Sequence, residues 1–63
     1  SKEQKVLLYL KDNGSITTQA ATILCEYKTR AGARKLLEKM IQNGVLIKIG
    51  SGPATKYKMS EGQ

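Results

Sequence analysis

The side chains of this sequence best suited to bind another molecule are cationic, and they are unevenly distributed. Residues 27–60 contain eight lysines and arginines and a single acid, Glu38. In residues 1–26 three lysines balance three carboxylates, so the second half carries the whole net charge of +6. Such a concentration of cations is typical of a surface that binds the phosphates of a nucleic acid. The alternative is an ordinary solvated surface, since lysine is common on small domains.

Two arginines are the first candidates for contact with DNA bases. Arg30 and Arg34 are four residues apart, so on a helix both guanidinium groups can point outward together. Arginine is well shaped for the edge of guanine or for a phosphate. Thr29 is expected to cap this helix, and its hydroxyl or amide offers a further phosphate contact. The other predicted DNA-binding residues lie on the same helix and on the segment after it: Ala31, Lys35, Lys39, Lys48, Lys56 and Lys58.

No constellation of residues predicts an enzyme. The chain has one cysteine and no histidine, which argues against a disulfide, a usual zinc site or a histidine-assisted nucleophile. The segment Gly50-Ser51-Gly52 lacks the lysine and the following helix of a nucleotide-binding loop. Cys25 is expected to be a small buried hydrophobe. We therefore expect no enzymatic activity, no cofactor and no metal.

Helical periodicity predicts the elements of the first half. The apolar residues Val6, Leu7 and Leu10 share one face of a helix over Lys2–Asp12, which an Asn-Gly pair ends. A short extended piece follows at residues 15–16. Thr17 or Thr18 then caps a second helix that ends near residue 25.

The second half is predicted to form a helix and a hairpin. The third helix begins after Thr29 and ends at Asn43-Gly44. Its apolar face follows helical spacing through Ala33, Leu36, Leu37, Met40 and Ile41. Gly32 costs this helix about 0.5–1 kcal/mol relative to alanine, which a close approach of DNA or of the second helix would explain. Two alternating segments around a glycine-rich tip then predict a β-hairpin, in which Tyr57 packs inward, opposite its neighbouring lysines.

This order of elements predicts an α+β winged helix-turn-helix: a three-helix bundle with a short strand and a C-terminal β-hairpin wing. Sixty-three residues allow a single domain, residues 1–63. Because the chain starts without methionine, we expect a fragment of a longer protein, with a disordered tail at residues 60–63. No apolar run approaches the ~20 residues of a membrane span. Without a targeting signal, and with a lone thiol, a cytoplasmic location is expected.

Several segments also resemble a known family. They are Tyr27–Leu37, the Asn-Gly-Val-Leu run at 43–46, Gly50–Gly52 and Thr55–Tyr57. Together they resemble the C-terminal winged-helix domain of bacterial transcriptional regulators described as RecG-type helicase-related, and similar modules of Fic-type proteins. The resemblance implies that the third helix enters the DNA major groove.

Three residues depart from the pattern of that family. Pro53 and Ala54 stand where family members often have arginine and glycine, which favours phosphate contact over insertion of the wing tip into the minor groove. Glu26 stands where the turn commonly has glycine, which leaves the conformation of that turn open.

We therefore expect a non-enzymatic module that binds double-stranded DNA, in a bacterial transcriptional regulator or helicase-related protein. The alternative is a winged-helix protein interaction or dimerisation domain that uses the apolar run at residues 45–49. A homodimer or other domains of the parent protein are possible partners, although the first helix is short for a dimer helix. Recognition of left-handed DNA is a third reading, because Gly52-Pro53 before Tyr57 resembles the proline-bearing wing of Zα-type domains. It is disfavoured by Arg34 and Glu38, where such domains use asparagine and tyrosine.

Overall fold

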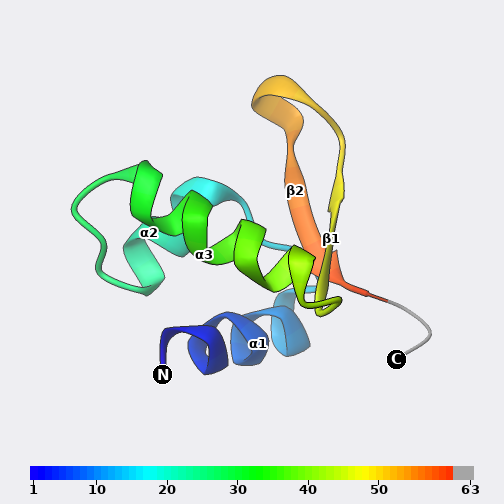
Figure 1. The fold of residues 1–63 in the computed structure, drawn as a ribbon, viewed down its shortest axis with the longest axis horizontal. Helices are drawn as coiled ribbons and strands as arrows, with labels where there is room; N and C mark the ends of the chain where they lie inside the picture. Colours follow the sequence, from blue (N-terminus) through cyan, green and yellow to red (C-terminus); the bar gives the residue numbers. More distant parts are fainter. Residues whose placement is uncertain (61–63) are drawn as a thin grey trace.

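The computed structural model describes residues 1–60 of the chain. It is an α+β structure in which three helices precede a two-stranded antiparallel hairpin (Figure 1). The elements are α1 (Lys2–Asn13), α2 (Thr18–Leu24), α3 (Arg30–Gln42), β1 (Leu46–Ile49), the short 3-10 helix η1 (Gly52–Ala54) and β2 (Lys56–Met59). The predicted order and the predicted helix ends are confirmed, the ends to within one residue.

The helices begin where side chains can accept backbone hydrogen bonds. Ser1 forms a capping box with Gln4 at the start of α1. Thr17, and not Thr18, caps α2 by accepting the N–H of Ala20 at 3.1 Å. Thr29 occupies the N-cap position of α3 with an extended backbone, but its side chain makes no capping hydrogen bond. The predicted N-cap position is therefore confirmed, whereas the capping hydrogen bond expected of Thr29 is absent.

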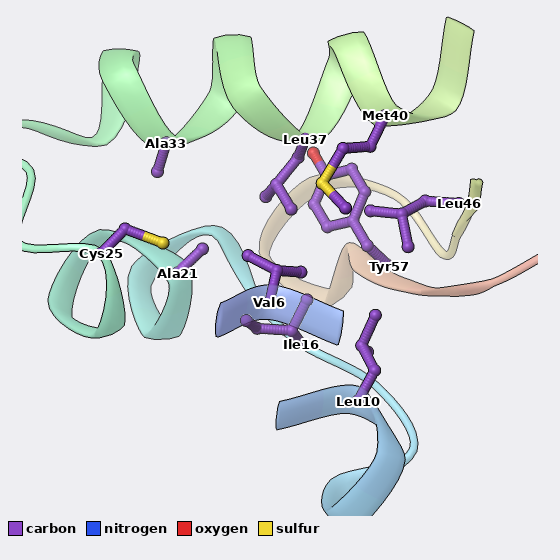
Figure 2. Close-up of a cluster of buried hydrophobic side chains, with 10 residues drawn as sticks. All are labelled: Val6, Leu10, Ile16, Ala21, Cys25, Ala33, Leu37, Met40, Leu46 and Tyr57. Atoms are coloured by element: carbon purple, nitrogen blue, oxygen red, sulfur yellow. The ribbon is translucent and has the colours of Figure 1, made fainter. Parts of the chain in front are cut away.

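The core lies between α3 on one side and α1, α2 and the hairpin on the other. In Figure 2 the side chains of Ala33 and Leu37 point from α3 toward Val6, Ile16 and Ala21. The buried hydrophobic side chains come from every major element: Val6, Leu10, Ile16, Ala21, Cys25, Ala33, Leu37, Met40, Leu46 and Tyr57. The predicted apolar face of the third helix is confirmed, with Leu36 and Ile41 half-buried at its margins.

Tyr57 ties the hairpin to the helices. It is buried at the centre of β2 and pairs with Lys48 across the hairpin. On its other side it exchanges two backbone hydrogen bonds with Ile16, at 2.9 and 2.8 Å, so the predicted extended piece becomes a single bridge to β2. At the tip Gly50 has φ +77°, and a Cβ there would lie 2.6 Å from the carbonyl oxygen of Ala54. The tip is therefore closed by a turn that only glycine fits.

The turn between α2 and α3 explains the glycine inside α3. A Cβ at Gly32 would lie 2.6 Å from Cδ1 of Tyr27, so Gly32 makes room for this ring. The group nearest Gly32 is thus this ring and not α2, which was one of the two expected reasons. The Nζ of Lys2 lies 4.1 Å from the centroid of the same ring, which ties α1 to the turn. Glu26 adopts φ +60°, so it takes the left-handed conformation for which glycine is better suited.

The first residue of the predicted disordered tail, Ser60, is ordered and is held beside the hairpin. The backbone N–H of Ser60 donates to the carbonyl oxygen of Val45 at 2.9 Å. Residues 61–63, the remainder of that predicted disordered tail, lie outside the described residues.

Candidate nucleic-acid interface

A groove of about 630 Å³ separates the outer side of α3 from the hairpin. The residues that line it come from three parts of the fold: the start of α2, α3, and the hairpin with its tip. Its lining is largely polar and includes three cations and one carboxylate. The lining residues are Thr17, Thr18, Gln19, Arg30, Arg34, Glu38, Lys48, Gly52, Pro53, Thr55 and Tyr57.

The α3 side of the groove carries the two predicted arginines. Arg30 and Arg34 are exposed, one helical turn apart, and both line the groove. One guanidinium nitrogen of Arg30 donates to Oε1 of Gln19 at 2.9 Å. This bond joins the start of α2 to the start of α3, so it holds Arg30 in place while its other N–H groups stay available.

The hairpin side of the groove contributes Lys48. In an antiparallel pair, directly opposed residues share a face of the sheet, and Lys48 opposes Tyr57. Both residues accordingly line the groove. Lys48 thus brings a third positive charge to the site from an element distant in sequence from α3.

The other two hairpin lysines lie on the opposite face. Lys56 opposes Ile49 and Lys58 opposes Ile47 in the register of the hairpin. These four residues alternate with Tyr57 and Lys48, so they form the outer face of the hairpin, away from the groove. Sequence reasoning grouped the three lysines as one basic wing, whereas the structure divides them between two faces.

The remaining predicted contacts lie on α3 but outside the lining of the groove. Lys39 turns toward α1, where its Nζ lies 3.9 Å from a carboxylate oxygen of Glu3. Ala31 and Lys35 are exposed on α3. Thr29 is exposed at the N-terminal end of that helix, with a hydroxyl that does not cap it.

Sequence reasoning missed several lining residues because they carry no distinctive signal. Gln19 is one polar residue in the first turn of a short helix, and only its contact with Arg30 shows its place. Thr55 reads as part of a turn, and its hydroxyl donates to the carbonyl of Gly52 at 2.9 Å. Glu38, the single acid of residues 27–60, was not among the predicted contacts but lines the groove. It makes no ion pair within residues 1–60, so an unpaired carboxylate shares the groove with Arg30 and Arg34 on α3 and with Lys48 on the hairpin.

Cys25 lies in the core and not in the groove, as expected for a small hydrophobe. Burial raises the pKa of its thiol above the ordinary value. Its Sγ contacts the carbonyl oxygen of Lys2 at 3.7 Å. The thiol is therefore held in its neutral form, which is the less nucleophilic one.

Comparison with known proteins gave no match: no family model, no curated protein and no solved structure proved similar to this chain. None of the helices formed by residues 1–60 combines the length and the apolar character needed to cross a membrane.

Proposed function

We propose that this chain is a winged helix-turn-helix module that binds double-stranded DNA, with α3 in the major groove and the hairpin as the wing. The observation that carries the proposal is the convergence of Arg30, Arg34 and Lys48 on one groove from two separate elements. Three cations against one carboxylate leave this lining positive, as a surface that neutralises phosphates requires. The hydrogen bond from Arg30 to Gln19 supports a fixed helix pair of the kind that presents a recognition helix.

The positions of the cations suggest a division of roles. In helix-turn-helix proteins the N-terminal part of the recognition helix approaches the base edges. Arg30 and Arg34 occupy this part of α3, so they are assigned to bases or to the nearest phosphates. Lys48 stands on the wing side, where a flexible ammonium group suits a phosphate of the adjacent backbone.

The N-terminal end of α3 adds a second attraction for phosphate. The first backbone N–H groups of a helix have no partner within the helix, and they carry the positive end of its dipole. Because the side chain of Thr29 leaves them uncapped, these groups and the hydroxyl of Thr29 are open to an anion. Ala31 and Lys35 extend the same surface along α3, whereas Lys39, Lys56 and Lys58 contribute to the general field only.

An NMR titration of the amide resonances with a short mixed-sequence duplex tests the proposal. At low salt we expect shifts at the start of α2, in the first half of α3 and around Lys48, and we expect them to fade as salt is added. Arg34→Glu should remove most of this response, because it reverses a charge inside the groove. Shifts confined to the outer face of the hairpin, or unchanged binding by Arg34→Glu, would contradict the proposed site.

A proposed DNA-binding role also suggests what the module does for a longer chain. A small non-enzymatic DNA-binding domain places whatever it is attached to on DNA, as in transcriptional regulators and helicase-related proteins. Domain deletion in the parent protein, followed by a measurement of its DNA occupancy, checks this part.

A further inference from the structure

The outward face of α1 carries an exposed apolar side chain, Leu8, and lies apart from the groove. Val6 and Leu10 point from α1 into the core, whereas Leu8 lies on the other side of the helix with 65% of its surface exposed. A shallow hollow of about 240 Å³ adjoins Leu8 and includes Tyr9 and Leu24. Leu8 and the hollow beside it thus form an apolar area that no other part of residues 1–60 covers.

Charged residues flank this leucine symmetrically. Lys5, Leu8 and Asp12 are three and four residues apart, so they form one stripe along α1. The midpoint between Lys5 and Asp12 along α1 falls between Leu8 and Tyr9. Because an α-helix rises 1.5 Å per residue, each of the two charged residues lies about 5 Å from this midpoint along the helix axis. Lys5 and Asp12 are both exposed, and neither forms an ion pair within the part of the chain that the structure describes.

This stripe is complementary to itself when it is turned end to end. We propose that α1 pairs in antiparallel fashion with α1 of a second copy of this chain, about a two-fold axis near Leu8. Lys5 of each copy then meets Asp12 of the other, and Leu8 packs against Tyr9 and Leu8 across the axis. A two-fold interface requires that residue i meets j while j meets i, and a stripe with opposite charges at equal distances from its centre meets this condition.

The charge pattern favours an antiparallel over a parallel pairing of the two α1 helices. A parallel pairing of the two helices would place Lys5 on Lys5 and Asp12 on Asp12, which is repulsive. The hollow and the groove share no lining residue, so pairing through α1 leaves the groove of each copy uncovered. The inference does not rest on DNA binding.

The short length of α1, which argued against a dimer helix in the sequence, limits the strength of the pairing. One helix crossing buries less surface than a standard protein interface, so we expect a dissociation constant on the order of 0.1 mM. Sedimentation equilibrium without DNA should show a reversible monomer–dimer equilibrium. Leu8→Gln should raise its dissociation constant at least about tenfold, because the apolar centre of the contact is lost. Ile47→Thr, which removes an apolar group from the outer face of the hairpin, is the matched control and should leave the equilibrium unchanged.

Charge exchange tests the antiparallel geometry directly. Lys5→Glu and Asp12→Lys should each abolish self-association, because each places like charges opposite one another across the axis. Both changes suit the dipole of α1, so the helix should survive them, and circular dichroism checks this. An equimolar mixture of the two single variants should associate at least as well as the unmodified chain, since all facing pairs are then of opposite sign. The double variant should associate with itself.

Two results would overturn the inference. One is a chain that stays monomeric up to about 1 mM, roughly tenfold above the expected dissociation constant. The other is a mixture of the single variants that associates no better than either variant alone. Neither result bears on the groove, and loss of DNA binding would leave the dimer measurement intact.

Discussion

Replacement of Lys48 by glutamine separates a groove contact from a general effect of positive charge. Lys48 lines the groove opposite Arg34, whereas Lys39 lies on the same strongly basic half of the chain but turns toward Glu3 of α1. Lys48→Gln and Lys39→Gln remove the same charge and keep a side chain of similar length. Any difference between the two variants therefore reports position and not net charge.

The expected loss of DNA affinity in Lys48→Gln follows from counterion release. Each phosphate neutralised on duplex DNA contributes about 0.9 to the slope of log K against log salt. At about 0.1 M salt, one decade below the 1 M reference, one lost contact lowers log K by about 0.9, an eightfold loss of affinity. Lys48→Gln should thus bind about eightfold more weakly, with a slope about 0.9 shallower. Lys39→Gln should change the affinity less than about twofold, because screening acts over about 10 Å at this salt.

Fluorescence anisotropy with a labelled duplex, at salt concentrations between about 50 and 200 mM, measures both quantities. The unmodified chain and the two variants are titrated side by side, and thermal unfolding confirms that each is folded. Equal losses for the two variants, or an unchanged slope for Lys48→Gln, would refute the assignment of Lys48 to a phosphate.

Three further predictions concern the fold. Gly32→Ala should lower the free energy of unfolding, measured in urea, by about 1–2 kcal/mol. The new Cβ would lie 2.6 Å from the ring of Tyr27, and this clash outweighs the gain in helix propensity. A stabilised variant would contradict this packing. Glu26→Gly should raise the free energy of unfolding by about 0.5–1 kcal/mol, because glycine relieves the left-handed backbone at φ +60°. The greater entropy of glycine in the unfolded chain offsets part of this gain. A lower unfolding midpoint would show that the strain is absent. Burial raises the pKa of Cys25 above 9.0, so the folded state holds the thiol proton more tightly than the unfolded state. The contribution of the protonated thiol to the free energy of unfolding is therefore complete below pH 9.0, and it is lost as the pH rises through the higher folded-state pKa. In urea unfolding at pH values around and above 9.0, Cys25→Ala should not show this loss of stability. Identical pH profiles for the variant and the unmodified chain would show that Cys25 does not cause the loss.

Local patterns account for the parts of the fold that the sequence predicted. Each long helix ends at an Asn-Gly pair, and the spacing of apolar residues on α3 needs no knowledge of its neighbours. Tyr57 could be placed inward because strand alternation is also a local property. These features depend only on residues a few positions apart.

The positions of the lysines depended on contacts that no local pattern contains. The register of the hairpin is set by η1 and by the closed tip at Gly50, and a shift of one residue would exchange the two faces. Only this register shows that Lys48 shares the face of Tyr57 and lines the groove. The contact of Tyr27 with Gly32 is likewise visible only once the turn between α2 and α3 is folded.

The division of the cations changes what their number implies for DNA binding. If all eight cations of residues 27–60 met phosphates, log K would fall with log salt with a slope near −7. The groove contains three of them, and Lys35 on the adjacent face of α3 makes four, so we expect a slope of about −3 to −4. A slope near −7 for the unmodified chain would mean that Lys28, Lys39 and the two lysines on the outer face of the hairpin also contact DNA. The same titration that tests Lys48 thus also measures how much of the basic half of this chain binds DNA.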